Sequence, residues 1–395
     1  MNNVVIIDGV RTPIGSFGGG LKALPAQQLA QHAIRALMQR TGIDPASVDE
    51  VILGNVGNYS DATNVARVAA LLAGLPVRVP AYSVHRNCSS ALQAIVSACQ
   101  HIACGDAEIV IAGGVESMSQ APYVNRDLRW GKRLRHTVMA DSVMEELTDG
   151  FCGLGMGQTA ENLAEEFRIS RVEQDAFALL SHQRAVRAWQ QGTFKDEVVP
   201  IEFPKAKAGR TQPPPLTQDE SPRADVNLER LAKLAPVFKE GGTVTAGNAS
   251  PLSDGAAAAL VVSAARAKTL GMTPLGSVRA YAFAGVEPER MGIGPAAAIP
   301  LAVKKAGLTL RQIQLIEVNE AFAAQYLAVE KALDLDREIV NVNGGAIALG
   351  HPTGMSGARL VITLLREMAR RDFSLGVVSL CIGGGQGAAM VLERA

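Results

Sequence analysis

The chain has 395 residues, enough for two or three domains with a large hydrophobic core. Lysine plus arginine and aspartate plus glutamate each number 38, so no global field favours nucleic acid or an anionic membrane. Hydrophobic residues make up 48% and aromatic residues 4%, a composition typical of a packed α/β enzyme.

The five cysteines indicate free thiols. Their number is odd and their spacing matches neither zinc-binding nor redox motifs, which favours a reducing compartment and no metal site. A strand-like run begins at Val4, directly after Met1-Asn2-Asn3, no stretch reaches the length of a membrane span, and the last three residues are not a peroxisomal signal. We therefore expect a cytoplasmic protein.

The first elements alternate between strand and helix. The pattern predicts a strand at 4–7, a Gly-rich loop at 11–20, a helix at 25–41, a strand at 51–53 and a helix at 64–73. A continuous apolar run at 108–114 is typical of a strand buried on both faces. The order is that of an α/β protein.

Cys88 lies between an extended run and a helix, in the stretch around which the rest of the chain is organised. Apolar residues recur at helical spacing from Ala91 to Cys99, and the helix is expected to continue to about Gly105. This places Cys88 in the first turn, where free N–H groups and the helix dipole favour a thiolate. The alternative is an inert buried cysteine, because free cysteine behaves as a small hydrophobe.

The chain repeats itself at a constant offset. Residues 33–51 align with residues 298–316, the helix after Cys88 aligns with 356–360, and the strand at 109–114 aligns with 377–384. Two copies of one strand-and-helix unit are therefore expected to pack together, with a site at their seam. Between the copies, residues 119–247 form an insert. It holds a basic stretch at 126–135, helices at 158–168 and 171–191, and a Pro/Lys/Gln loop at 204–222. We expect this insert to form a binding lid.

Three further segments carry polar or glycine-rich motifs: Asn319 to Ala323, Gly344 to Gly354 and Leu380 to Gly387. The second places His351 before a proline, and the third ends a strand in Cys381 and a glycine turn whose N–H groups can converge on an anion. Each motif alone is weak, because glycine turns are common and a lone histidine is more often structural. Their position at matching ends of two repeats favours function.

Together the motifs resemble the thiolase family from Val5 to the C-terminus. The segments that carry the resemblance are Cys88-Ser89-Ser90-Ala91-Leu92-Gln93-Ala94, Gly247-Asn248-Ala249-Ser250 followed by Asp254-Gly255-Ala256-Ala257, Asn319-Glu320-Ala321-Phe322, Gly350-His351-Pro352 and Cys381-Ile382-Gly383-Gly384-Gly385. The resemblance implies an α/β thiolase fold: two repeated βαβαβαββ core domains in a layered α-β-α-β-α arrangement with an inserted loop domain. The implied boundaries are 1–118 plus 248–272 for the N-terminal core domain, 119–247 for the CoA-binding insert and 273–395 for the C-terminal core domain.

The resemblance also implies the reaction acyl-CoA + acetyl-CoA = 3-ketoacyl-CoA + CoA, in two steps and without a metal or redox cofactor. Cys88 would carry the acyl group, His351 would take its proton, and Cys381 would be the second acid/base. The enolate oxygen would bind His351 and a water held by Asn319. The thioester oxygen would bind the N–H groups of Cys88 and Gly383.

Coenzyme A would be a substrate, bound by the insert and the Ser250 loop. Ser250 matches a serine that meets the pantetheine arm, and Arg223 matches an arginine near the adenine. The remaining positions are apolar, with ordinary core as the alternative: Leu147, Met156, Phe238, Ala246 and Phe322. The chain departs from the family pattern at Gly155, where short-chain enzymes usually carry histidine, at Pro251-Leu252, and at Thr353 and Met355.

The pattern favours an acetyl-CoA acetyltransferase acting on acetoacetyl-CoA, with a broader-chain 3-ketoacyl-CoA thiolase of β-oxidation as the alternative. A decarboxylating ketoacyl synthase would not need Cys381, and a non-catalytic lipid-binding or scaffolding relative would be expected to lose the motif residues. A homodimer or homotetramer is expected, without nucleic acid or membrane partners. The other cysteines and histidines are expected to be structural: Cys99, Cys104, Cys152, His32, His85, His101, His136 and His182, of which His85 lies near Cys88.

Overall fold

The computed structural model describes residues 4–203 and 214–394. Its main sheet has the strand order β10-β11-β12-β9-β1-β8-β5-β3-β4, with β2 beside β8, and β6 and β7 form a separate pair. The strands are β1 (Val4–Arg11), β2 (Gly15–Ser16), β3 (Glu50–Gly54), β4 (Ala81–Val84), β5 (Ile109–Ser117), β6 (Tyr123–Val124), β7 (Ala140–Asp141), β8 (Ser253–Ser263), β9 (Gly276–Gly285), β10 (Leu315–Val318), β11 (Leu375–Ile382) and β12 (Gln386–Arg394).

The helices are α1 (Ala26–Thr41), α2 (Val65–Ala73), α3 (Ser90–Cys104), α4 (Ser142–Glu146), α5 (Met156–Glu166), α6 (Arg171–Gln190), α7 (Leu228–Ala232), α8 (Ala264–Thr269), α9 (Gly294–Lys305), α10 (Ala323–Leu333), α11 (Ala346–Leu349) and α12 (Ser356–Arg371). Within the described ranges, none of them is long and apolar enough to cross a membrane. The expected elements of the first 120 residues are all present, with ends shifted by a few residues.

The predicted internal repeat is confirmed by the strand pairing. In the first half β3 pairs parallel to β5 and β5 antiparallel to β8, and in the second half β10 pairs parallel to β11 and β11 antiparallel to β12. A single parallel bridge between Ile316 and Val340 stands where β4 pairs in the first half. Among the described residues, the halves join into one sheet only through the short β1–β9 pairing at Val5 and Ile6.

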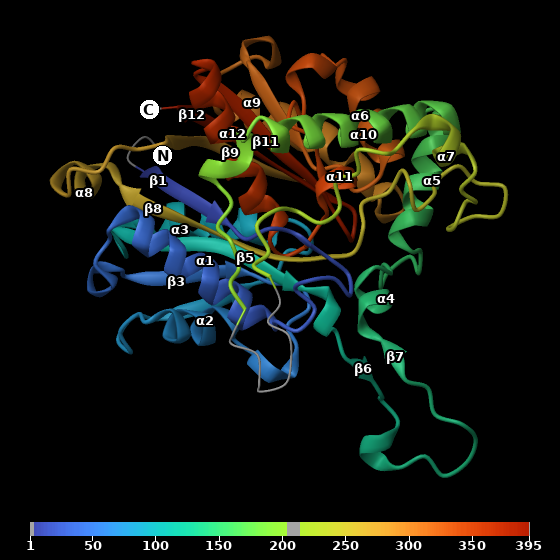
Figure 1. Ribbon diagram of the computed structural model, residues 1–395, viewed down its shortest axis with the longest axis horizontal. Coiled ribbons are helices and arrows are strands. Elements are labelled where there is room, and N and C mark those ends of the chain that lie inside the picture. Colours follow the sequence, from blue (N-terminus) through green and yellow to red (C-terminus); the bar gives the residue numbers. More distant parts are fainter. Residues whose placement is uncertain (1–3, 204–213, 395) are drawn as a thin grey trace.

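Two buried helices lie between the halves. Helix α3 is apolar on nearly every side, the pattern of a helix enclosed by protein, and it crosses α12 closely. A Cβ on Gly357 of α12 would come within 2.5 Å of the Leu92 nitrogen of α3, so glycine permits this approach. Helices α1 and α2 cover the outer face of the first half, and α9 and α10 cover the second (Figure 1). The result is the expected five-layered α-β-α-β-α arrangement.

The insert has two parts with different roles. The β6–β7 arm extends away from the body (Figure 1), whereas α5 and α6 pack on the second half. Phe177 of α6 stacks on Tyr326 of α10 with ring centroids 4.1 Å apart, and Leu163 of α5 belongs to the same core. The prediction that the helical pair forms a lid is therefore wrong: its apolar faces complete the second core. Residues 204–213 of the predicted Pro/Lys/Gln loop lie outside the described residues.

Arg11 at the end of β1 anchors the insert to the body. Its guanidinium is fully buried, with Nε 2.7 Å from Glu197 Oε1 and Nη1 2.7 Å from Asp219 Oδ1. Two carboxylates satisfy one buried cation with charge-assisted hydrogen bonds, and a planar guanidinium suits such a fork. Glu197 precedes residues 204–213 and Asp219 follows them, so the Arg11 side chain holds the chain on both sides of this segment.

Candidate functional site

Cys88 lies in a tight turn two residues before α3. The helix begins at Ser90 rather than at Cys88, so the expected place of Cys88 in the first turn is wrong. The Ser90 hydroxyl donates to the Asn87 carbonyl at 2.7 Å and accepts from the Arg86 N–H at 2.8 Å, which closes the turn. Asn87 has φ +43°, a left-handed conformation that asparagine tolerates better than most residues. The turn holds Cys88 at the mouth of the helix.

The glycine turn after β11 meets the Cys88 turn. The Asn87 side-chain amide donates to the Gly383 carbonyl at 2.6 Å, and the Gly383 N–H faces the Cys88 sulfur. Gly385 has φ +77°, and a Cβ there would come 2.3 Å from the Val286 carbonyl oxygen. Only glycine fits this turn, which directs the Gly383 N–H toward the sulfur.

The two cysteines of the site are electrostatically coupled. Cys381 is fully buried at the end of β11, and burial together with the neighbouring Cys88 raises its thiol pKa well above the usual range. Burial raises the pKa of Cys88 to about 11, although the N–H groups of Gly383 and Cys88 itself lower it. At rest this favours a thiol over the expected thiolate, because the loss of water around the sulfur opposes the two N–H groups.

His351 is fixed at both ring nitrogens. Nδ1 lies 2.6 Å from Ser356 Oγ, and Nε2 lies 3.2 Å from Asn319 Nδ2. Since Ser356 Oγ already donates to the Pro352 carbonyl at 2.9 Å, we assign the proton to His351 Nδ1 and the lone pair to Nε2. Asn319 is fully buried, and its Oδ1 has no hydrogen-bond partner within the described parts of the chain.

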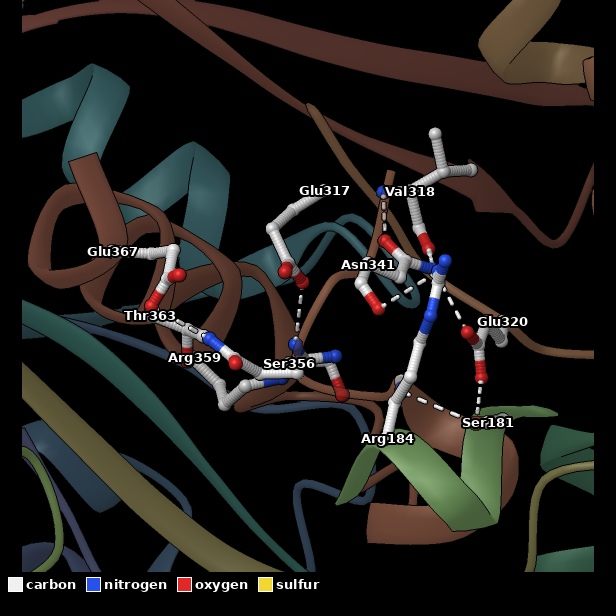
Figure 2. A network of polar contacts seen from close by, with 12 residues as sticks. Ser181, Arg184, Glu317, Val318, Glu320, Asn341, Ser356, Arg359, Thr363 and Glu367 are labelled. Atoms are coloured by element: carbon white, nitrogen blue, oxygen red, sulfur yellow. Dashed lines mark hydrogen bonds and ion pairs between the residues drawn. The ribbon is translucent and has the colours of Figure 1, made fainter. Parts of the chain in front are cut away.

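A buried polar network lies beside the loops that carry His351 and Asn319, and Figure 2 shows its Glu317–Arg359 pair and the contacts of Glu320. Burial, and then the charge of Arg359, lowers the pKa of His351 to about 3, so the imidazole is neutral at physiological pH. Arg359 pairs with Glu317 at 2.9 Å, with both side chains at most 3% exposed. Next to Asn319, the Glu320 carboxylate accepts from Ser181 at 2.6 Å and Asn341 at 2.9 Å. Ser356 of α12 therefore holds the His351 loop, and Ser181 of α6 holds the Asn319 loop through Glu320.

The apolar residues predicted for the substrate channel form one cluster. Met156, Phe322 and Cys381 are buried together, and Leu147 and Phe238 pack against them. The Phe238 and Phe322 rings meet edge to face with centroids 5.8 Å apart. This cluster places an apolar wall directly beside the buried thiol of Cys381.

The Ser250 loop runs alongside the Asn319 loop. The Ser250 N–H donates to the Ala321 carbonyl at 2.9 Å, and Ala249 forms a bridge with Phe322. On its other side lies a cavity of about 540 Å³ whose lining includes Arg223, Ala246, Ala249 and Pro251. The structure therefore brings the predicted Arg223 and Ala246 to one cavity beside Ser250.

His182 is a lining residue of this cavity, although we expected it to be structural. Its Nδ1 accepts the Arg223 N–H at 3.2 Å. Burial, followed by the charge of Arg223, lowers the pKa of His182 to about 4, so it is a neutral acceptor. No spacing signal connects His182 with residue 223, because the contact joins a helix interior to a loop 41 residues later.

A second cavity, of about 680 Å³, adjoins the Cys88 turn. Asn87, Met156, Gly383 and Tyr59 are among its lining residues. A Cβ on Gly155 would make ordinary van der Waals contacts, at 3.5 Å to Gln158 Oε1 and 3.9 Å to the Leu147 carbonyl oxygen, so a side chain would fit at 155 and the glycine leaves its place unfilled. Glu146 also lines this cavity and contacts the buried Thr353, and the sequence indicated a role for neither residue.

Comparison with known proteins gives consistent matches over the whole chain. The family model for the thiolase N-terminal domain matches residues 4–265, and that for the thiolase C-terminal domain matches residues 272–394. An acetyl-CoA acetyltransferase of Pseudomonas aeruginosa is 52% identical over 395 residues, covering 100% of both chains.

Two solved structures extend the comparison. The crystal structure of the Bacillus anthracis acetyl-CoA acetyltransferase is 48% identical, covers 100% of this chain and 99% of its own, and superposes with a TM-score of 0.97. That of human mitochondrial 3-ketoacyl-CoA thiolase in complex with CoA is 46% identical, covers 100% and 98%, and has a TM-score of 0.95. These superpositions confirm the predicted fold of two repeated halves.

Proposed function

Because the chain belongs to the thiolase family, we propose that it is an acyltransferase that catalyses acyl-CoA + acetyl-CoA = 3-ketoacyl-CoA + CoA through an acyl group on Cys88. The observation that carries the proposal is the convergence of two thiols and an N–H donor: Cys88, the coupled Cys381 and the Gly383 N–H. A thiol nucleophile, a second acid/base and an anion-stabilising donor are what this chemistry needs.

In the first half-reaction the Cys88 sulfur forms a bond to the thioester carbonyl carbon, and the bond from that carbon to the CoA sulfur breaks. Because the resting Cys88 is a thiol, its proton must leave as the sulfur attacks. His351 Nε2, the ring nitrogen without the resting proton, receives it, and Cys381 gives its own proton to the departing CoA thiolate, which leaves an imidazolium and a Cys381 thiolate. The N–H groups of Cys88 and Gly383 stabilise the tetrahedral oxyanion.

In the second half-reaction the Cys381 thiolate takes a proton from the methyl group of acetyl-CoA, and the resulting enolate carbon forms a bond to the acyl carbon. The bond from that carbon to the Cys88 sulfur then breaks, and His351 returns its proton to Cys88. The buried Asn319 Oδ1, which lacks a partner among the described residues, supports a site for a water that donates to the enolate oxygen. The N–H at Nε2 of the His351 imidazolium is the second donor. Thiolysis runs through the same groups in reverse.

The cavity of about 540 Å³ beside Ser250 is proposed to hold CoA. Arg223 at its exposed side suits the charged nucleotide portion, and Ser250 lies on the loop that continues toward Asn319. The cluster of Leu147, Phe238 and Phe322 provides an apolar wall for the pantetheine arm next to Cys381. No further cofactor enters the proposal.

The likeness to proteins named acetyl-CoA acetyltransferase supports acetoacetyl-CoA as the 3-ketoacyl substrate of this chain. A broader range of acyl chains is the second candidate. It is supported by the lack of a side chain at Gly155, where one would fit, and by the cavity of about 680 Å³ beside Gly383 and Met156.

The thiolysis rate against acyl-chain length tests both candidates, from acetoacetyl-CoA to medium-chain 3-ketoacyl-CoA, with Cys88→Ala as the control. A preference for acetoacetyl-CoA supports the acetyltransferase. Equal or higher rates on longer chains support the second candidate. Activity retained in Cys88→Ala would contradict the acyl-enzyme route altogether.

We also propose a homodimer or homotetramer located in the cytoplasm, with 1–118 plus 248–272, 119–247 and 273–395 as its domains. The oligomer is supported by apolar side chains on the projecting arm: Trp130 is 90% and Leu134 82% exposed. Exposed apolar groups on an extended arm are typical of contact surfaces. Light scattering of wild type and Trp130→Ser tests this, since a monomer in both would contradict it.

A further inference from the structure

Thr353, two residues after His351, contacts two carboxyl groups from different parts of the chain. Its Oγ1 lies 3.1 Å from Glu116 Oε2 at the end of β5 and 2.7 Å from Glu146 Oε1 at the end of α4. Thr353 is 3% exposed, so water does not compete for these bonds. The same loop also donates the Gly354 N–H to Glu116 at 3.0 Å.

A hydroxyl has one proton, so Thr353 donates to only one of the two carboxyl groups. The other contact is favourable only if the second carboxyl is a protonated acid that donates to the Thr353 oxygen. Two ionised carboxylates around one buried hydroxyl would leave one lone pair facing another and would repel each other. One of Glu116 and Glu146 must therefore carry a proton.

The hydrogen-bond partners assign the proton to Glu146. Glu116 accepts five donors, each at 3.0 or 3.1 Å: the Asn55 amide, the Thr353 hydroxyl and the N–H groups of Val56, Gly57 and Gly354. Such an arrangement solvates an anion. Glu146 contacts only Thr353, and its buried Oε2 has no partner among the residues that the structure describes. Burial, and then the charge of Glu116, raises the pKa of Glu146 to about 8.

We propose that Glu146 is a positioning residue: its carboxylic acid donates to Thr353, completes the anchoring of the His351 loop on Glu116, and keeps a second negative charge away from Cys88. This deepens the proposed function, on which its catalytic consequence rests. The proton on Glu146 and the place of the loop are properties of the protein that do not depend on that function.

Ionisation of Glu146 has two effects in the same direction. It removes the donor to Thr353, and it places an anion beside Cys88, where a negative tetrahedral oxyanion must form. Titratable groups surround Glu146 from other elements: Glu116 of β5, Cys88 before α3, His85 and Asp149 on the same cavity, and Tyr59, whose pKa burial and the two glutamates raise well above the usual range. No lysine or arginine is among the described residues that line this cavity. Since the pKa of Glu146 is raised, the acid form is present below about pH 8 and is lost above it.

The proton is tested first, by infrared spectroscopy of the full-length protein at about pH 6 and about pH 10, either side of that transition. The wild-type-minus-Glu146→Gln difference should contain a protonated carboxylic acid band at the lower pH and not at the higher. Glu145→Gln is the matched control, because the neighbouring Glu145 is 40% exposed and pairs with Arg126. Absence of the band from the difference would overturn the proposal, whether or not the enzyme is a thiolase.

The positioning role is tested by the pH profile of acyl transfer. Wild-type kcat should fall about tenfold per pH unit above the Glu146 transition, while Glu146→Gln, which keeps a donor but cannot ionise, should lack this fall. Thr353→Val should lower kcat about tenfold at every pH with little change in KM, and Thr353→Ser should restore it. An identical alkaline fall in wild type and Glu146→Gln would overturn the role.

The NMR resonances of the His351 ring provide a readout that needs no activity. Thr353→Val should shift them and Thr353→Ser should not. Unshifted resonances in Thr353→Val would contradict the anchoring. If acyl transfer is absent from the wild type while the infrared and NMR results hold, the proposed function fails and the positioning of the loop stands.

Discussion

The side-chain amide of Asn87 donates to the carbonyl of Gly383 across 2.6 Å, which joins two turns that lie 296 residues apart in the sequence. This single bond sets the Gly383 N–H opposite the Cys88 sulfur. Since the Cys88 turn comes from the first repeat and the glycine turn from the second, the bond lies at the seam where the repeats meet.

Asn87→Gly isolates this bond, because glycine adopts φ +43° without strain. We expect kcat for acyl transfer to fall about tenfold, since the Gly383 donor is no longer held against Cys88. KM for acetyl-CoA should change little. Steady-state kinetics check this, and unaltered kcat in Asn87→Gly would show that the glycine turn holds its place without the amide.

Asn319→Ala should lower kcat by about 100- to 1000-fold, the range for loss of an oxyanion donor. The substitution removes both the contact with His351 Nε2 and the orphan Oδ1. Asn343→Ala is the matched control: this asparagine bonds Glu367 on the far end of α12, away from His351. Steady-state kinetics and thermal unfolding of Asn319→Ala and Asn343→Ala separate a loss of catalysis from a loss of stability. Equal losses of activity would mean that Asn319 acts through stability alone.

Arg359→Met should destabilise the protein by about 3–5 kcal/mol, because Glu317 would be left as a buried carboxylate without its partner. The double variant Glu317→Gln/Arg359→Met should recover most of this loss, since neither charge remains. Urea denaturation of the single and double variants measures the difference. A double variant no more stable than Arg359→Met would indicate that Arg359 stabilises the fold by packing rather than by pairing.

Arg11→Met should also lower the free energy of unfolding, by about 3–5 kcal/mol, because it leaves Glu197 and Asp219 buried together without their cation. The insert should detach first, because the bonds of Arg11 to these two residues hold it on β1. Limited proteolysis near the 204–213 segment, compared with that of the exposed control Arg230→Met, checks this. Equal cleavage of the two variants would contradict the anchoring role.

Hydrophobic periodicity and the internal repeat predicted most of the fold. The apolar runs at Ile109–Ser117 and around α3 are long, regular and buried, so local pattern and tertiary environment agree there. The helical pair of the insert was predicted as helices but with the wrong role. Its partner surface, which includes Tyr326, lies about 150 residues away, and a pattern within one helix does not reveal what covers it.

The candidate site was predicted from motifs at the ends of the repeats, and the structure brings Cys88, Cys381 and Gly383 together and pairs His351 with Asn319. The protonation states were not predictable in this way. Helix position favoured a Cys88 thiolate, yet burial, which sequence does not quantify, raises the thiol pKa to about 11. Glu146 gave no signal either, because its environment is created by Thr353, a residue 207 positions later.

The central claim is that Cys88 carries the acyl group, and intact mass spectrometry after incubation with acetyl-CoA tests it most directly. We predict a single acetyl adduct that maps to Cys88, disappears in Cys88→Ala, persists in Cys99→Ala, and is discharged by added CoA. Cys99 is the matched control because it is a buried cysteine of α3 outside the site. The absence of an adduct on the wild-type protein, or an adduct that survives Cys88→Ala, would contradict the account.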